Sequence, residues 1–337
     1  MADINVLITL PFPEELLEKL RALSPRLNVK LQSSASGEES PAEIWTNVEV
    51  LYTFHRLPEP MDAPDLRWIQ LHSSGVDHII DHPLLRSDVQ ITTLSGVAAP
   101  GAVEFVLMAI LGLARRLPAM MEDKLEKRWA ENRFERFQPR ELRGSTVGIV
   151  GYGSIGREIA RICRAFGATT LATKRNLKVL NDRGYTIKGL GDPGAELVER
   201  MYPHQALASM ASLCDFLVIT APLTPETRGI VDEKVLKIMR PSSYIIDISR
   251  GGIVDHGALV EALTEEHIAG AALDVFPVEP LPESSPLWDL PNVILSPNIA
   301  AVSPRYYELA MDLFVKNMQH YLAEQPLLNR YREERGY

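Results

Sequence analysis

The sequence predicts an α/β fold of two lobes, each built on a parallel sheet. Its 337 residues suit two domains of roughly 150 residues each, and 46% apolar side chains are enough to bury a core in both. Short runs rich in β-branched and aromatic residues alternate with helical patterns, which is the order found in parallel sheets covered by crossover helices. These runs form two sets with a long helical pattern between them, so we expect one sheet in each lobe.

The expected elements follow one another along the chain. The strands of the first set are NVLITL (5–10), VEVLYTF (48–54), LRWIQLHSS (66–74) and VQITTLS (89–95). A continuous helical pattern over 99–129 leads to the second set, which is TVGIVGYG (146–153), TTLAT (169–173), FLVITAPL (216–223), SYIIDIS (243–249), AGAALDVF (269–276) and NVILSP (292–297). A last amphipathic helix over 304–325 places Leu309, Leu313 and Met318 near one face. This helix can return the chain to the first lobe.

Composition narrows the classes of partner and the compartment. The formal net charge is −9, and an acidic balance argues against nucleic acid and against an anionic membrane as partners. The apolar run over 105–114 is shorter than the ~20 residues that span a bilayer, and Asp3 stands where a signal peptide would be basic. Cys163 and Cys214 lie in apolar stretches, as buried thiols in a reducing compartment do. We expect a cytoplasmic protein that acts on small molecules.

The strongest local signal is a glycine-rich turn, GYGSIG, between a predicted strand and a predicted helix. The turn contains Gly151, Gly153, Ser154, Ile155 and Gly156. In this strand–turn–helix setting the glycines let the backbone turn tightly and approach a pyrophosphate at the helix N-terminus. We predict a dinucleotide site at this turn.

The end of the next predicted strand indicates which dinucleotide binds. NAD sites place Asp or Glu about 20 residues beyond the glycines, where the carboxylate accepts a hydrogen bond from the ribose 2′-hydroxyl. This chain has Lys174 and Arg175 there, and basic side chains at this position can hold the 2′-phosphate of NADP. The other interpretation is that both are solvated loop charges. We favour NADP, with NAD as the alternative.

Polar side chains follow three later strands, at the sheet edge where ligands bind. Arg250 follows SYIIDIS, Asp274 and then Glu279 follow the run AGAAL, and Asn298 follows NVILSP. An arginine in this place can bind a carboxylate through two parallel hydrogen bonds, and a nearby carboxylate can orient an acid or a base. Asn298 is the exception, because an amide neither gives nor takes a proton near neutral pH.

In their order along the chain, these stretches resemble the D-isomer-specific 2-hydroxyacid dehydrogenase family, which includes glyoxylate/hydroxypyruvate reductases. The similar stretches are IQLHSSGVDHI, VGIVGYGSIGREIA, APLTPETRGIV, ISRGGIVD, AGAALDVFPVEPLP and NVILSPNIA, and together they span most of the chain. The resemblance implies a Rossmann-type cofactor domain, residues 99–297, inserted into a flavodoxin-like split substrate domain, residues 1–98 and 298–337. It also implies a homodimer built around the helical region 99–129.

The resemblance also implies roles for single residues. Arg250 would bind the substrate, and Glu279 would be the relay carboxylate of the catalytic group. The backbone N–H groups of Ser74, Gly75 and Val76 would bind the substrate carboxylate. The positions that would lie along the cofactor are Pro222, Thr227, Ile248, Ser249 and Asp274, of which Asp274 would contact the nicotinamide carboxamide.

The chain departs from this family at two places. Asn298 stands where the family has its catalytic histidine, so a hydrogen bond to the substrate oxygen is kept and proton transfer is lost. Candidate substitute acids are Glu279 acting through water and His55, His72 and His78 of the first lobe, although a surface or structural role is commoner for such histidines. The second departure is the long connection over 176–210. It either lies beside the adenosine end of the cofactor or decorates the surface, and we favour decoration.

Two functions of different class follow. The first is an NAD(P)-dependent oxidoreductase that interconverts a small 2-oxoacid and a D-2-hydroxyacid by hydride transfer, with turnover reduced by Asn298. The second is a catalytically weak cofactor-binding protein with a regulatory or partner-binding role on the same fold. Retention of Arg250 and Glu279 favours the first function, because a pure binding module has little need of both.

Overall fold

The computed structural model describes residues 3–32, 42–182 and 184–332. The three ranges hold all the helices and strands named below. Among the helices of these residues, none combines the length and the apolar character needed to cross a bilayer.

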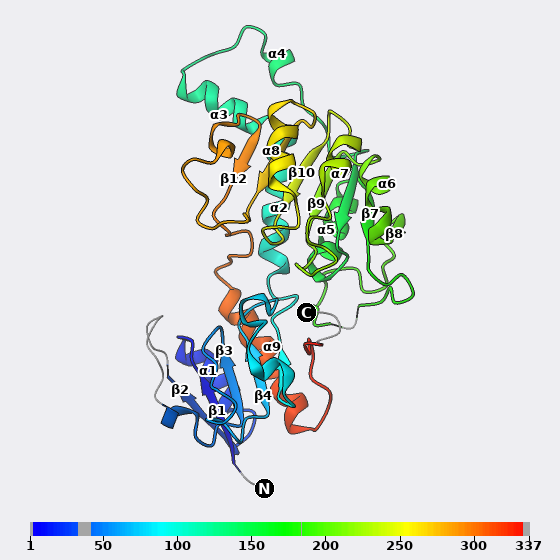
Figure 1. The fold of residues 1–337 in the computed structure, drawn as a ribbon. Helices are drawn as coiled ribbons and strands as arrows, with labels where there is room; N and C mark the ends of the chain where they lie inside the picture. The colour runs from blue at the N-terminus through cyan, green and yellow to red at the C-terminus, as the bar shows by residue number, and fades with distance from the viewer. Residues whose placement is uncertain (1–2, 33–41, 183, 333–337) are drawn as a thin grey trace. The chain divides into compact units, whose positions relative to one another are not determined.

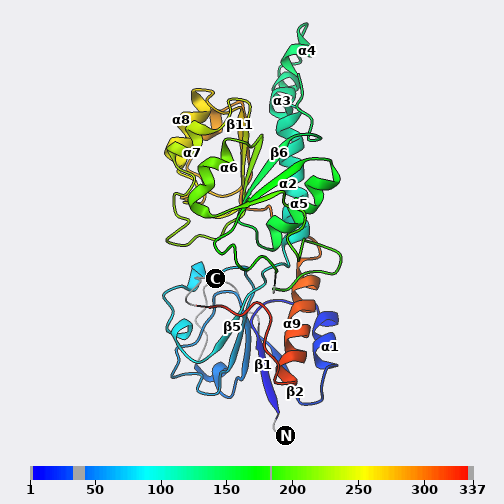
Figure 2. The same ribbon diagram turned by 90° about the vertical axis from the view of Figure 1, so that its right-hand side faces the viewer.

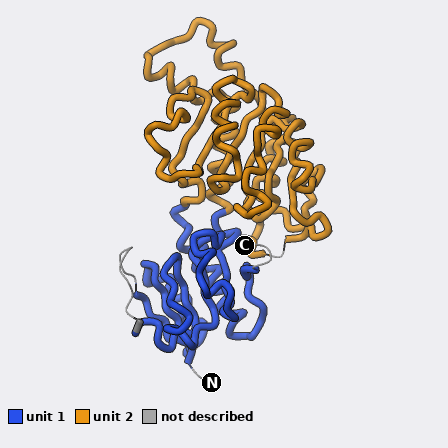
Figure 3. The backbone as a smooth tube through the Cα atoms, viewed as in Figure 1, with its two compact units in different colours: residues 1–98, 303–337 blue, residues 99–302 orange. Residues whose placement is uncertain are grey.

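The chain divides into two compact units (Figure 3). Unit 1 comprises Met1–Ala98 together with Ser303–Tyr337, and unit 2 is Ala99–Val302. Unit 2 is therefore an insertion between two parts of unit 1. The second boundary differs from the expected one, because residues 298–302 belong to unit 2. Asn298 thus lies in the same unit as the glycine-rich turn.

Unit 1 contains a five-stranded parallel sheet (Figure 1). Its strands are β1 (Ile4–Ile8), β2 (Leu27–Leu31), β3 (Val50–Thr53), β4 (Trp68–Leu71) and β5 (Gln90–Thr92). Their spatial order is β2-β1-β3-β4-β5, and each neighbouring pair is parallel. This is the doubly wound order of flavodoxin-like domains, in which ligands bind at the carboxyl ends of the strands.

The two faces of the unit 1 sheet have separate cores, because successive side chains of a strand point to opposite faces. The long helices of unit 1 are α1 (Glu14–Arg21) and α9 (Tyr306–Leu322). Both cover one face, where they pack against Val6 and Ile8 (Figure 2). Leu7 points to the other face and packs with Leu85. The amphipathic pattern predicted for α9 is confirmed, since Leu309, Leu313 and Met318 are buried.

Unit 2 contains a seven-stranded parallel sheet. Its strands are β6 (Thr146–Val150), β7 (Thr169–Thr173), β8 (Arg200–Tyr202), β9 (Phe216–Ile219), β10 (Tyr244–Asp247), β11 (Gly270–Leu273) and β12 (Val293–Leu295). The spatial order is β12-β11-β10-β9-β6-β7-β8, so the first strand of the unit lies between the second and the fourth. This is the Rossmann order, whose ligand crevice opens where the order reverses, between β6 and β9.

Helices cover both faces of the unit 2 sheet (Figure 2). Helices α2 (Ala99–Ala114) and α5 (Ser154–Ala165) cover one face, and α6 (Leu207–Ala211), α7 (Glu233–Ile238) and α8 (His256–Thr264) cover the other. Helices α3 (Leu117–Leu125) and α4 (Arg133–Arg136) extend beyond the sheet (Figure 1). Phe216 and Val218 of β9 share a core with α2 and α5, whereas Leu217 and Ile219 share one with α6, α7 and α8. The fully apolar strand is explained by these two buried faces.

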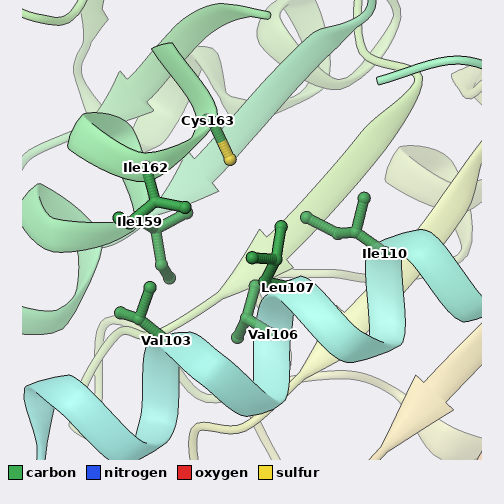
Figure 4. Close-up of a pocket in the computed structure, with 7 residues that line it drawn as sticks. All are labelled: Val103, Val106, Leu107, Ile110, Ile159, Ile162 and Cys163. Atoms are coloured by element: carbon green, nitrogen blue, oxygen red, sulfur yellow. The ribbon is translucent and has the colours of Figure 1, made fainter. Parts of the chain in front are cut away.

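Helices α2 and α5 meet along a small apolar pocket (Figure 4). Its lining is Val103, Val106, Leu107, Ile110, Ile159, Ile162 and Cys163. It contains no charged side chain that could orient a ligand, so we assign it to the hydrophobic core. Cys163 and Cys214 are both free and buried, as predicted, and burial raises the pKa of the Cys163 thiol to about 12.

Three elements differ from the prediction. The helix expected over 99–129 is interrupted, because Arg116 has a left-handed backbone with φ of 59° and α3 starts beyond it. Pro118 in the first turn of α3 has no N–H with which to continue α2. Strands β2 and β8 were not predicted, and both form edges of their sheets.

Candidate active site and dinucleotide site

The glycine-rich turn connects β6 to α5, as predicted. Gly151 has φ of +100°, and a Cβ on it would lie 2.7 Å from the Cα of Ala221, so only glycine fits here. Gly153 is the N-cap of α5, and a Cβ on it would meet no atom of the described chain within 4 Å. The chain is therefore open on this side of Gly153, next to Ser154 and Ile155 at the start of α5, where backbone N–H groups can bind a pyrophosphate.

The loop after β9 braces this turn. Thr220 donates from Oγ1 to the carbonyl of Gly151 at 2.8 Å. Farther along the loop, Thr227 donates from Oγ1 to the carbonyl of Pro222 at 2.6 Å and accepts from the N–H of Thr224 at 2.8 Å. Pro222 and Thr227, two predicted cofactor positions, thus belong to one hydrogen-bonded loop at the point where the strand order reverses.

Lys174 and Arg175 directly follow β7, the strand next to the glycine-rich turn. Lys174 donates from Nζ to the carbonyl of Tyr152 at 3.4 Å, and Tyr152 stands between the first two glycines. Burial lowers the pKa of Lys174, and the nearby charge of Arg157 lowers it further. The charge of Asp182 acts in the opposite direction. The ammonium therefore lies beside the turn, partly withdrawn from water, where an anion would be a favourable partner.

Ile248, Ser249 and Arg250 follow β10, which neighbours β9. Arg250 donates from Nη1 to the carbonyl of Ser249 at 2.8 Å. The next residue, Gly251, lies so close to the loop after β11 that a Cβ on it would be 2.0 Å from the carbonyl oxygen of Phe276. The loop that carries Arg250 is thus packed against the loop that leads to Glu279.

Glu279 and Asn298 form a hydrogen-bonded pair. Asn298 donates from Nδ2 to Oε2 of Glu279 at 2.9 Å, and Oε1 of Glu279 accepts from the N–H of Phe276 at 3.0 Å. Asn298 has φ of 54°, a left-handed conformation that Asn tolerates better than most residues. The amide is therefore oriented by a carboxylate at the sheet edge, where it can form hydrogen bonds without transferring protons.

Asp274 holds the loop that carries Asn298. Its side chain is buried, and Oδ1 accepts from Ser296 Oγ at 2.6 Å and from the N–H of Ile299 at 2.8 Å. Oδ2 accepts from the N–H of Ala300 at 2.9 Å. These bonds give Asp274 a structural role in orienting Asn298. Its contact with a nicotinamide carboxamide stays a prediction.

Asp247, the last residue of β10, was missed by the sequence analysis. Its side chain is fully buried, and Oδ1 accepts from the N–H of Ser249 at 3.0 Å and from Ser249 Oγ at 2.5 Å. Oδ2 is buried without a hydrogen-bond partner among the described residues. Burial raises the pKa of Asp247 to about 7, and the charge of Asp274 also raises it. The signal that could have revealed it is an acid inside an otherwise apolar strand, three residues before Arg250.

In unit 1, Ser74, Gly75 and Val76 form the loop after β4. Ser73 donates from Oγ to the carbonyl of Gly75 at 2.7 Å and so folds the loop back on itself. None of the three N–H groups of residues 74–76 donates to a carbonyl within the described part of the chain. Such groups can bind an anion, so the predicted carboxylate-binding role is compatible with this loop and stays a prediction.

The three histidines considered as substitute acids lie at the carboxyl edge of the unit 1 sheet. His72 Nδ1 is 2.7 Å from the Tyr52 hydroxyl, and burial lowers the pKa of His72 to about 4. His72 is therefore neutral at pH 7. His78 stacks on Phe54 and its Nε2 is 2.8 Å from the Phe54 carbonyl. The ring of His55 meets that of Phe54 edge-on, so His55 and His78 share an aromatic cluster with Phe54.

The described residues include no group of three or more histidine, cysteine, aspartate or glutamate side chains that could hold a metal ion. Unit 2 alone brings together a dinucleotide turn, an arginine and an oriented carboxylate–amide pair. A glycine-rich turn of this kind can bind a dinucleotide, and an arginine can bind a small anion.

Comparison with known proteins gives one consistent result. Residues 107–300 match the model of the D-isomer specific 2-hydroxyacid dehydrogenase, NAD binding domain. The chain is 32% identical to a glyoxylate reductase of Thermofilum pendens over 94% of this chain and 91% of the relative. Among solved structures it is similar to a D-isomer specific 2-hydroxyacid dehydrogenase of Xanthobacter autotrophicus in complex with NADPH and MES (TM-score 0.82, 28% identity, all of both chains covered). It is also similar to an NADPH-dependent glyoxylate/hydroxypyruvate reductase of Sinorhizobium meliloti in complex with NADP and sulfate (TM-score 0.79, 26% identity, 99% and 100% covered).

Proposed function

The chain belongs to the D-isomer specific 2-hydroxyacid dehydrogenase family, and on this premise we propose that it reduces a small 2-oxoacid, such as glyoxylate, to the D-2-hydroxyacid. Its relatives support an NAD(P)-dependent oxidoreductase of 2-hydroxyacids. The observation that carries the proposal is the oriented pair Glu279–Asn298, formed beside the packed loop of Arg250.

The residues of unit 2 have different tasks in this reaction. Arg250 binds the substrate carboxylate through two parallel hydrogen bonds. The glycine-rich turn would hold the nicotinamide cofactor, which supplies a hydride when bound. The carbonyl oxygen then has to gain a proton, and Asn298 can donate a hydrogen bond to this oxygen but cannot protonate it. The side chain at position 298 thus cannot supply the proton, so we propose that Asn298 slows turnover.

Steady-state reduction of a panel of 2-oxoacids tests the activity. Arg250→Lys should lower kcat/KM about ten- to a hundredfold, because an ammonium cannot reproduce the planar fork that binds a carboxylate. The exposed residue Arg164 on α5 provides the control variant Arg164→Lys, which should leave kcat/KM unchanged. Undiminished turnover in Arg250→Lys would remove Arg250 from the mechanism. Tight cofactor binding with no reduction of any oxoacid would instead support the regulatory alternative.

We also propose that NADPH is the preferred cofactor. The support is the position of Lys174 beside the glycine-rich turn, with its pKa lowered by burial and by a neighbouring cation. A 2′-phosphate would gain charge-assisted hydrogen bonds there, which NADH cannot make. Titration of both reduced cofactors should show tighter NADPH binding, and Lys174→Ala/Arg175→Ala should remove the difference. Equal binding of NADH by the unaltered chain would contradict this preference.

A homodimer built around the helical region 99–129 is the third part of the proposal, and Phe134 lies just beyond this region. Leu125, Trp129 and Phe134 are 81%, 85% and 80% exposed, and large apolar side chains gathered in one exposed segment mark a contact surface. Light scattering should give twice the mass of one chain for the unaltered protein, and the mass of a single chain for the double variant Leu125→Glu/Trp129→Glu. Met61, which is 85% exposed in unit 1, supplies the control Met61→Glu. A monomeric unaltered chain would refute the dimer.

A further inference from the structure

The long connection over 176–210 is bound to the glycine-rich turn. Tyr152, inside the turn, donates from its hydroxyl to Oδ2 of Asp192 at 2.5 Å. Asp192 is buried and also accepts from the N–H groups of Glu196 at 2.9 Å and Leu197 at 3.0 Å. The connection therefore does more than decorate the surface, because one of its carboxylates is fixed by its own backbone and holds the turn.

A buried guanidinium reinforces this attachment. Arg157, in the first turn of α5, is 1% exposed. It donates to the carbonyls of Asp192 and Leu180, both in the connection, and lies 4.8 Å from the centre of the Tyr152 ring. A buried cation is tolerated only with such partners. The carbonyls of the connection thus accept the hydrogen bonds that a buried guanidinium requires. One network of contacts therefore links α5, the turn and the connection.

The same network ends at Lys174. The Lys174 ammonium is bonded to the Tyr152 carbonyl at 3.4 Å, and the charges of Arg157 and Asp182 both act on it. Asp182 belongs to the connection and lies 3.5 Å from Nε of Arg157. The location of Lys174 therefore depends on a residue, Tyr152, whose side chain is held by the connection.

We propose that the connection over 176–210 is a specificity element for the cofactor's 2′-phosphate: Asp192 holds Tyr152, and Tyr152 fixes Lys174 where a phosphate on the adenosine ribose would bind. Tyr152 and Asp192 are positioning residues that need not touch the ligand. The inference rests on the NADPH preference proposed above and assigns that preference a structural cause outside the two basic residues.

Two fragment ligands isolate the phosphate. Adenosine 2′,5′-bisphosphate carries the 2′-phosphate and AMP lacks it, and calorimetric titration of the full chain with each requires no turnover. Tyr152→Phe removes only the hydroxyl that binds Asp192. We expect it to weaken binding of the bisphosphate about three- to tenfold, as expected for a lost hydrogen bond to a charged group that acts through a neighbour, and to leave AMP binding unchanged.

The control is Tyr244→Phe, since Tyr244 is also buried but starts β10 at the amino edge of the sheet. It should change the affinity for neither ligand. If Tyr152→Phe weakens the binding of both ligands equally, or of neither, the inference is overturned. Asp192→Asn, which leaves the Tyr152 hydroxyl intact and removes the charge it binds, should act in the same direction as Tyr152→Phe, and a loss confined to AMP would equally refute the proposal.

The outcome also separates the inference from the cofactor preference. If Lys174→Ala removes the advantage of the bisphosphate while Tyr152→Phe keeps it, the NADPH preference stands and the role of the connection is wrong. If the unaltered chain binds both ligands equally, the preference itself fails and the inference fails with it. In the double variant Tyr152→Phe/Lys174→Ala, the two losses should not add, because both act through one ammonium.

Discussion

The two units have the same kind of sheet, with opposite chemistry at its carboxyl edge. In unit 2 the strand ends carry acidic and basic groups, Asp247, Arg250 and Asp274. In unit 1 the residues after β3 and β4 are Phe54 and His72, and the His72 ring contacts four aromatic rings, of Phe12, Tyr52, Tyr306 and Tyr307. Sheet topology therefore sets where a ligand edge lies, and the residues after the strands decide its chemistry.

The difference extends to the buried titratable groups. Desolvation disfavours the charged form of both His72 and Asp247, so it lowers the pKa of the histidine to about 4 and raises that of the aspartate to about 7. Both groups are neutral in slightly acidic solution, yet the free energies of unfolding of the two units respond to pH in opposite directions. Desolvation thus gives the two units opposite pH dependences of stability, by which they can be distinguished.

The largest expected effect tests whether unit 2 lacks only an acid. Asn298→His should raise kcat for 2-oxoacid reduction about 10²- to 10⁴-fold, the usual contribution of a positioned general acid. The left-handed backbone at this position suits histidine as well as asparagine, and Glu279 lies 2.9 Å from the amide nitrogen that the ring would replace. The new rate should vary with pH near the ordinary pKa of histidine, about 6.5.

Adding Glu279→Gln to Asn298→His should remove much of the gain, because the ring loses the carboxylate that orients it. Profiles of kcat against pH for the original chain and both variants, at saturating cofactor, provide the measurement. An original chain that is already fast, and that Asn298→His leaves unchanged or slower, would show that another group supplies the proton.

Much of this site could be predicted because its residues stand in local patterns. Gly151 and the strand before it are contiguous in sequence, so their geometry follows from local rules. Arg250 and Asn298 each follow a run of apolar residues, which predicts the sheet edge at which they lie. Strands β2 and β8 escaped prediction because β2 exposes several side chains and β8 is only three residues long, so hydrophobic periodicity is weak in both.

What escaped prediction in the site depends on tertiary contacts. The raised pKa of Asp247 comes from burial and from the charge of Asp274, which follows the neighbouring strand β11. No local pattern contains either cause. Likewise, Tyr152 and Asp192 are 40 residues apart, and the connection that carries Asp192 has the turn-rich composition of a surface loop. Only the folded chain shows that it binds the glycine-rich turn.

The second prediction concerns stability in unit 2. The pKa of Asp247 is raised from 3.8 to about 7 in the folded chain, so the native state binds a proton more tightly than the unfolded one. The free energy of unfolding should then fall as pH rises from about 4 to about 7. Asp247→Asn is isosteric with the protonated acid and should remove this slope. Its stability relative to the original chain should therefore be greater at pH 8 than at pH 4, by an amount on the order of a few kcal/mol.

A probe specific to unit 2 makes this measurable. The only two cysteines, Cys163 and Cys214, are both buried in this unit, so a short pulse of thiol reagent at one fixed pH, after equilibration in urea at a chosen pH, reports its unfolding. Asp289→Asn changes the same charge at an exposed position and serves as the control. A pH slope that is equal in Asp247→Asn and in the original chain would show that the carboxyl is not the cause.

The smallest expected effect has the opposite sign and belongs to unit 1. The pKa of His72 is lowered from 6.5 to about 4 in the folded chain, so between these values the unfolded state binds the additional proton. The contribution of His72 to the stability of unit 1 should be complete above pH 6.5 and should be lost as pH falls through this window, by at most about 3 kcal/mol.

Fluorescence of the buried Trp45 and Trp68 reports the unfolding of unit 1, because Trp129 and Trp288 of unit 2 are already exposed. His72→Gln can still hydrogen bond with the Tyr52 hydroxyl without titrating, so its unfolding midpoint in urea should lose this acid dependence, while His55→Gln, at an exposed position, should keep it. If acid instead stabilises unit 1, or if His72→Gln retains the full loss, then the two units do not differ through their buried neutral groups, and the electrostatic comparison between them is wrong.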